Sequence, residues 1–249
     1  MHVIKKSLLL VVLVTAAFAQ SPQPPLSDTR LSVNTLLRED LFSGFLADDM
    51  EHFARGEKNI KLLLEQRPDA KPTLLAWSGL ANMYRAVRAH EGNRPEEFQR
   101  YSKQALDVFS EANKLGPSDG GVIAVTGGTY AVLADRLPKE YRAAAWTQAY
   151  DNYKILWKFQ GASVDKLPVH LRGELLAGLA QSSQRTGHRE ETAEYVDKIL
   201  TVLANTPYES VAKRWKANPD SAATATITCL SCHDAGRLGP RLEALNKSK

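Results

Sequence analysis

Cysteine and methionine are scarce in this sequence, with two and three residues respectively among 249. Cys229 and Cys232 lie close together, and no second pair exists to complete the four ligands of a structural zinc site. Convincing runs of alternating apolar and polar residues are also missing, so we expect no βαβ unit. These absences argue against a zinc site and against a thiol–disulfide pair, which usually lies in a βαβ context.

A concentrated basic face and a second long apolar run are missing as well. The formal charge of +4 falls to +2 if Lys5 and Lys6 are removed with an N-terminal signal. Nucleic-acid-binding domains usually carry a concentrated basic face, so we expect no nucleic-acid partner. Residues 20–249 contain no stretch that resembles a transmembrane helix, and they are numerous enough to bury a core.

The first residues are typical of a secretory signal peptide. Lys5 and Lys6 form a basic region, residues 8–14 an apolar run, and residues 17–19 an Ala-Phe-Ala cleavage site. The apolar run is too short to cross a bilayer as a helix, although retention as a membrane anchor stays an alternative. We expect residues 1–19 to be removed and the mature protein to be periplasmic or otherwise exported.

Cys229-Leu230-Ser231-Cys232-His233 is a C-x-x-C-H motif, the attachment signature of c-type haem. Residues three apart in a helical turn share one face, so Cys229 and Cys232 can each form a thioether with a haem vinyl group. His233 would then lie under the porphyrin, where a ring nitrogen binds the iron. We therefore predict one covalent haem c. A periplasmic thiol pair and an inert cysteine-bearing helix are the alternatives.

No methionine or histidine follows His233. In the common small cytochromes c a downstream methionine is the second axial ligand, so here that ligand must come from upstream, from another chain or from water. His170 and His188 are the leading candidates. Four weaker ones, whose default roles are in the core or on the surface, are His52, His90, Met50 and Met83. Arg237 is a candidate partner for a haem propionate, with a solvated surface arginine as the alternative.

From about Leu31 onward, apolar residues recur at helical spacing, which predicts an all-α fold. The clearest unit places Trp77, Leu80, Ala81 and Tyr84 on a first helix, and Ala105, Phe109, Ala112 and the closing Pro117 on a second. This pattern resembles the tetratricopeptide repeat (TPR). The resemblance implies antiparallel helix pairs stacked as a solenoid, with a concave face for protein docking.

The match to the TPR pattern has one departure. Tyr84 and Ala105 are about twelve residues further apart than the repeat allows, so the helices or their turn must be longer than usual. Three weaker units are expected at residues 32–68 with Gly44, 120–160 with Gly127-Gly128, and 169–207 with Gly178. Four helix pairs exceed the minimum of about three that a solenoid needs.

The predicted organisation is a signal peptide (1–19), a proline-rich linker (20–30), a TPR-like domain (31–207) and a haem attachment segment (208–249). We expect the linker to be extended rather than packed. A short helix is expected at 208–217, ended by Asn218-Pro219-Asp220. Its Tyr208 and Trp215 are candidates for contact with the haem edge, with core packing as the alternative.

Together these features predict an exported monohaem c-type cytochrome that transfers electrons on a TPR-like scaffold. Its partner would be a redox protein, alone or within a larger membrane-associated complex. An electron carrier or scaffold is preferred to an enzyme, because no Ser/His/Asp or paired-carboxylate constellation stands out. Two alternatives remain, an interaction scaffold with a structural haem, and a sensor or peroxidase-like protein with an open iron position.

Overall fold

A computed structural model of the chain describes residues 23–223, 243 and 247. This part contains no strand, and the all-α prediction is confirmed. Its α-helices are α1 Val33–Ala47, α2 Met50–Gln66, α3 Lys71–Glu91, α4 Pro95–Leu115, α5 Gly120–Leu133, α6 Lys139–Gln160, α7 Val169–Arg185, α8 Arg189–Val202 and α9 Pro207–Ala217. Short 3-10 turns are η1 Pro68–Ala70, η2 Ala134–Arg136, η3 Gly161–Lys166 and η4 Pro219–Ala223.

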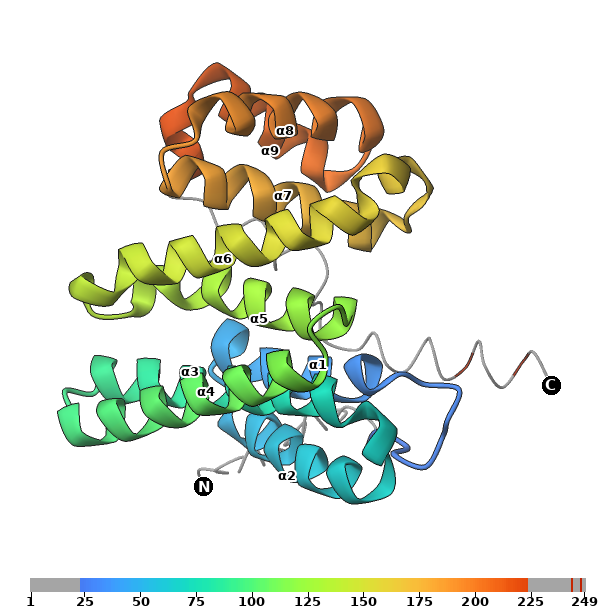
Figure 1. Cartoon of the computed structure of the whole chain (residues 1–249), viewed down its shortest axis with the longest axis vertical. Coiled ribbons are helices and arrows are strands. Elements are labelled where there is room, and N and C mark those ends of the chain that lie inside the picture. The colour runs from blue at the N-terminus through green and yellow to red at the C-terminus, as the bar shows by residue number, and fades with distance from the viewer. Residues whose placement is uncertain (1–22, 224–242, 244–246, 248–249) are drawn as a thin grey trace, which may run out of the picture.

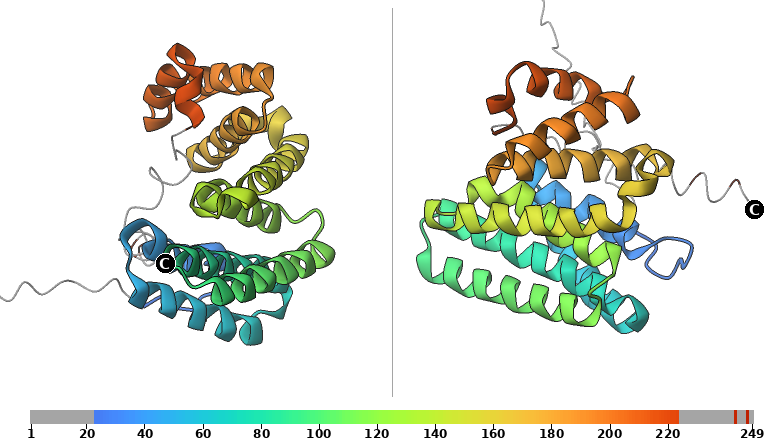
Figure 2. Two further views of the ribbon diagram at one scale, coloured as in Figure 1. Left: turned by 90° about the vertical axis from the view of Figure 1, so that its left-hand side faces the viewer. Right: turned by 45° about the horizontal axis from the view of Figure 1, so that its top comes forward.

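The helices form four consecutive pairs, α1–α2, α3–α4, α5–α6 and α7–α8, with α9 packed on α8. Figure 1 shows them as a stack, with α1 to α4 at one end, α5 and α6 in the middle, and α7 to α9 at the other end. Figure 2 shows the same order of layers from two further directions. The first helices of successive pairs contact one another, α1 with α3, α3 with α5, and α5 with α7.

The extra residues of the second pair lie in its helices. α3 and α4 have 21 residues each, and the turn between them is only Gly92, Asn93 and Arg94. The small positions predicted in the other units also fall on first helices, at Gly44 in α1, Gly127 in α5 and Gly178 in α7. The predicted helix pairs are therefore present, with α1 beginning a turn earlier than the pattern suggested.

Polar capping side chains and residues with positive φ determine where the helices begin and where the chain turns. The Ser32, Asp49 and Asp119 side chains accept hydrogen bonds from the first backbone N–H groups of α1, α2 and α5. Four residues in the turns between helices have positive φ, which asparagine, aspartate and glycine adopt most readily. They are Asp48 at 55°, Asn93 at 53°, Gly187 at 85° and Asn205 at 61°.

Bulky side chains lie directly over glycines where helices cross. A Cβ built on Gly44 would lie 2.6 Å from the Phe53 ring, and one on Gly79 would lie 2.5 Å from the Phe109 ring. Gly178 of α7 is covered in the same way by the ring of Tyr153 from α6, which links the third pair to the fourth. These separations leave no room for even a methyl group.

Polar ends of buried aromatic residues tie neighbouring pairs together. Trp77 Nε1 donates to Asn34 Oδ1 at 2.7 Å, and the Tyr84 hydroxyl donates to the Gly44 carbonyl at 2.7 Å. Both bonds run from α3 to α1, so the aromatic residues that mark the repeat pattern also fix its stacking. Buried aromatic residues need such partners for their polar atoms.

The described part of the proline-rich segment is packed, unlike the extended linker expected from its composition. Pro24 is buried, and Leu26 packs on the core. The Arg67 guanidinium at the end of α2 donates to the carbonyls of Leu31, Leu26 and Asp28 at 2.7, 2.6 and 2.8 Å. Three charge-assisted hydrogen bonds from one distant side chain therefore hold this segment on the first helix pair.

Replacement of Gly178 by alanine should destabilise the protein by about 1–3 kcal/mol, because the added methyl group overlaps the Tyr153 ring. Alanine favours a helix more than glycine does, so a loss would show that packing outweighs propensity. The measurement is urea unfolding. Gly120→Ala is the matched control, since its nearest neighbour would be Gln160 at 3.7 Å. A neutral Gly178→Ala variant would contradict the packing described here.

Candidate functional site

The predicted haem-attachment residues lie outside the part of the chain that the structure describes. They are Cys229, Cys232 and His233, with Arg237 beyond them, and the predicted signal peptide at 1–19 also lies outside it. The structure describes the chain up to Ala223 at the end of η4, six residues before Cys229. The candidate site is therefore the surface from which this segment departs.

The α9 helix and η4 cover the last helix pair at this end of the stack. α9 ends at Ala217 because Asn218 is extended, with φ −143° and ψ 92°, and Pro219 has no N–H to continue the helix. η4 then packs on α7. The predicted short helix and its break are thus confirmed.

The two aromatic residues of α9 differ in their surroundings. Tyr208 is 3% exposed and its ring covers Gly173 of α7, so its role is core packing. Trp215 is 2% exposed, but one side of it lines a pocket. Of the two, Trp215 is the residue that a group seated at this surface would contact.

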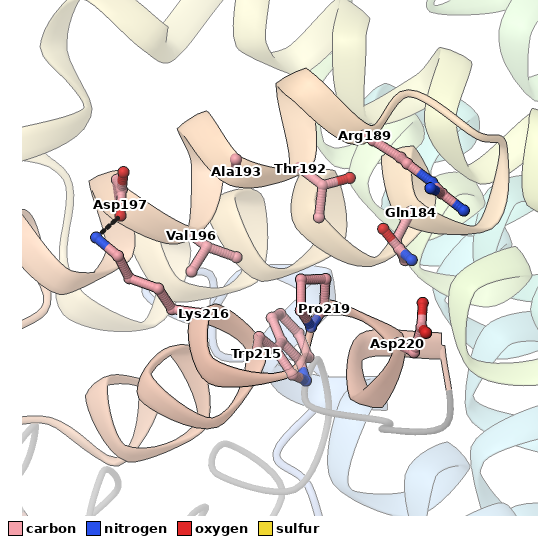
Figure 3. Close-up of a pocket in the computed structure, with 10 residues that line it drawn as sticks. All are labelled: Gln184, Arg189, Thr192, Ala193, Val196, Asp197, Trp215, Lys216, Pro219 and Asp220. Atoms are coloured by element: carbon pink, nitrogen blue, oxygen red, sulfur yellow. Dashed lines mark hydrogen bonds and ion pairs between the residues drawn. The ribbon is translucent and has the colours of Figure 1, made fainter.

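This cap pocket has a volume of about 380 Å³ and lies between α8 and the α9–η4 segment. Its lining residues are Gln184, Arg189, Thr192, Ala193, Val196, Asp197, Trp215, Lys216, Pro219 and Asp220. Figure 3 shows Val196 opposite Trp215 and Pro219, with Arg189 at one end of the pocket and Asp197 at the other. The pocket therefore has an apolar middle and charged ends.

The two charged ends of the cap pocket are not equivalent. Lys216 Nζ and Asp197 Oδ1 form an ion pair at 2.7 Å, so these charges offset each other. Arg189 is exposed, and no other described residue forms a hydrogen bond or ion pair with its guanidinium. Asp220 lies at the same end, so the charges there are mixed, and the Arg189 guanidinium is the group that can bind an anion such as a carboxylate.

His170, one of the two leading histidine candidates, faces charged neighbours. Its Nε2 lies 3.4 Å from Nη1 of Arg38 in α1 and 3.7 Å from Oε2 of Glu174 in α7. Its Nδ1 is buried. Both ring nitrogens therefore face protein rather than an open surface.

His188 is placed differently, at the exposed N-terminal cap of α8. Its ring stacks on Tyr150 of α6, with centroids 4.4 Å apart and planes 2° from parallel. Its Nδ1 lies 2.8 Å from the Thr186 hydroxyl, and no described residue binds its Nε2. The stacking and the hydrogen bond fix the imidazole while leaving one nitrogen accessible.

A small polar network supports the ring under His188. The Tyr150 hydroxyl donates to Glu191 Oε1 at 3.0 Å, and Lys154 Nζ donates to Glu191 Oε2 at 2.8 Å. Burial disfavours the Glu191 charge, but the hydrogen bonds from Lys154 and Tyr150 outweigh it and hold the pKa of Glu191 below its ordinary value. Glu191 is therefore an ionised anchor for the Tyr150 ring.

The four weaker candidate ligands do not line the cap pocket. His52 Nδ1 lies 2.5 Å from Asp49 Oδ2, and the His90 ring lies 6.0 Å from that of Phe98. Met50 packs on the core, and Met83 is buried in α3. These residues belong to α2 and α3, and the α5–α6 and α7–α8 pairs separate them from α9 (Figure 1).

Sequence reasoning missed Arg189 and Gln184, because α7, α8 and η4 meet only in the folded chain. One local signal was available for Arg189. It is the first residue of α8, where the helix dipole disfavours a positive charge. The helix dipole disfavours an arginine at that position, and Glu190 and Glu191 in the same turn offset part of this cost.

Comparison of the chain with protein-family models, with curated proteins and with solved structures finds no match. Among the described residues, no group of three or more histidine, cysteine, aspartate or glutamate side chains is arranged to hold a metal ion. No helix in the described ranges is both long enough and apolar enough to cross a bilayer.

Replacement of Glu191 by glutamine should reduce the loss of unfolding free energy that the protein shows as pH falls into the acid range. The pKa of Glu191 is lower in the folded protein, so its contribution is complete above its unfolded pKa of about 4.3 and is lost as pH falls further. Urea midpoints for wild type and Glu191→Gln should therefore differ at pH 7 and converge below about pH 4. Glu194→Gln, an exposed site on the same helix, is the control. A constant difference at all pH values would contradict this account.

Proposed function

We propose that the protein is an exported monohaem c-type cytochrome that transfers electrons. The observation that carries the proposal is the C-x-x-C-H motif at residues 229–233, which contains both cysteines of the chain. The signal-peptide pattern at residues 1–19 supports it, because bacteria attach this haem outside the cytoplasmic membrane.

The start of the haem-bearing segment beside the cap pocket supports a seat for the haem there. Five residues separate Ala223 from Cys229, and the six chain steps between them keep their Cα atoms within about 22 Å. Pro219 and Asp220 line the pocket and precede Ala223 by only four and three residues. The pocket is therefore within reach of a group attached at Cys229.

The residues of the C-x-x-C-H motif and of the cap pocket have the chemistry that haem c requires. Cys229 and Cys232 would hold it by thioethers, and His233 would be its proximal ligand. Bound haem c supplies reversible one-electron transfer. The Arg189 guanidinium can bind a propionate, with Arg237 as a second candidate, and the apolar strip of Val196, Trp215 and Pro219 can exclude water from the ring edge. Charge and burial of this kind are what tune a haem potential.

The repeat scaffold would then present the haem to its partner. The first helices of successive pairs contact one another, as those of stacked TPR-like units do. We propose that the partner is a redox protein or a membrane-associated redox complex, docked on the helical surface. The haem would be held at the C-terminal end of that surface.

Replacement of both cysteines, Cys229→Ala with Cys232→Ala, should abolish covalent haem. The protein would be exported from a host with c-type maturation, and its pyridine haemochrome spectrum recorded after acid-acetone extraction. Wild type and the spacer variant Ser231→Ala should keep a c-type α-band, because thioethers survive extraction, and the double variant should lose it. Absence of covalent haem in wild type would overturn the proposed function.

The axial ligand is tested by comparing His188→Ala with His170→Ala. His188 has an accessible nitrogen, whereas both nitrogens of His170 face protein. If a histidine of this chain completes the iron coordination, His188→Ala should convert a low-spin ferric spectrum to high-spin while His170→Ala does not. A high-spin wild type that binds carbon monoxide readily would instead favour an open-site sensor. The reverse order of effects would contradict the assignment of His188.

A further inference from the structure

A second and larger cavity lies between the second and third helix pairs, away from the cap. Its volume is about 640 Å³, which is within the range of sites for small organic molecules. Residues of α4 form one wall, residues of α5 and α6 form the other, and Met83 of α3 also lines it. We call this cavity the inter-pair cleft.

Aromatic rings from both walls line the inter-pair cleft. Phe98 of α4 meets Tyr141 of α6 edge-on with centroids 5.4 Å apart, and Phe109 of α4 meets Tyr130 of α5 at 5.7 Å. Tyr141 is 46% exposed, so an apolar ring surface faces solvent at the cleft. Aromatic walls of this kind favour a flat ring, which can pack in offset or edge-to-face geometry.

Two buried hydroxyl groups line the cleft without partners. Thr126 is 1% exposed, and neither its Oγ1 nor the buried Oγ of Ser102 forms a hydrogen bond within the described part of the chain. A buried hydroxyl without a partner is costly. Either hydroxyl would gain a hydrogen bond if the lining shifted enough to admit a ligand oxygen.

Thr129, one turn along the same helix, shows the ordinary arrangement. It is 2% exposed, and its hydroxyl donates to the Val125 carbonyl at 2.6 Å, as threonine commonly does in a helix. Thr129 does not line the cleft. Thr126 forgoes this bond, so its hydroxyl still has a hydrogen bond to donate.

Tyr130 is a further hydroxyl-bearing residue of the cleft. Burial raises the pKa of its phenol to about 12, so the hydroxyl stays protonated at neutral pH. The cleft thus combines aromatic walls with neutral hydroxyl groups, and its one cationic lining residue, Lys114, is exposed. A neutral acceptor suits this lining better than a carboxylate does.

We propose that the inter-pair cleft binds a flat aromatic molecule that carries a carbonyl oxygen, such as a naphthoquinone, with that oxygen accepting the Thr126 hydroxyl. This is a binding site, and it does not depend on the haem. All of its residues lie within helices α3 to α6 or the turn between α5 and α6.

The test is equilibrium dialysis of the mature protein with 2,3-dimethyl-1,4-naphthoquinone, whose blocked ring positions prevent addition of cysteine thiols. We expect saturable binding, and weaker binding of 2,3-dimethylnaphthalene, which lacks both carbonyls. Thr126→Val keeps the side-chain shape and should weaken quinone binding about tenfold. Thr129→Val, the matched control, should leave it unchanged.

A second variant tests the site without removing a buried polar group. Ala144 lines the cleft at an exposed position of α6, so Ala144→Phe can narrow the cleft without disturbing the core. It should abolish binding while the thermal unfolding midpoint stays near that of wild type. Retained binding in this variant would place the ligand elsewhere.

Three other results would overturn the proposal. They are no binding up to the solubility limit of the quinone, equal affinity for the hydrocarbon, and equal losses in Thr126→Val and Thr129→Val. Decanoate, an apolar chain with a carboxylate, is added as a competitor of the quinone for the inter-pair cleft. Displacement of the quinone that depends on Lys114 rather than on Thr126 would assign the cleft to carboxylates instead.

Discussion

The fold depends on one repeated contact, a larger side chain lying directly over a glycine of a first helix. Phe53 covers Gly44, Phe109 covers Gly79, and in the third pair Asn152 covers Gly127. In the fourth pair the covering side chains come from outside it, from Tyr153 of α6 and Tyr208 of α9. Protein interiors are close-packed, so these contacts set the helix spacing and couple the cap to the stack.

Much of this architecture could be predicted from the sequence, because helix spacing and caps are local signals. The positions of the helix pairs, the short α9 and its break at Pro219 were all readable from residue order. Gly79 was not singled out, although it lies directly under the Phe109 ring. Periodicity identifies a buried face, but the closest contact on that face depends on the crossing point of two helices.

Contacts between distant residues account for what was not predicted. The proline-rich composition suggested an extended linker, but the Arg67 guanidinium binds three carbonyls of this segment and holds it against the first pair. Arg67 lies 36 residues or more from these carbonyls along the chain, so the local sequence gives no sign of the contact. The C-x-x-C-H motif is local and could be recognised from residue order alone. The cap pocket and the inter-pair cleft could not, because each is assembled from three or more helical segments.

The two ends of the described chain are fastened at opposite ends of the stack. Arg67 holds residues 26–31 on the first pair, whereas η4 packs on α7 in the last (Figures 1 and 2). The helix pairs therefore act as a spacer between whatever precedes Gln23 and whatever follows Ala223. Because each pair contacts mainly its neighbours, gain or loss of one pair would change that span by a layer, and it would also break the contact between Arg38 of α1 and His170 of α7.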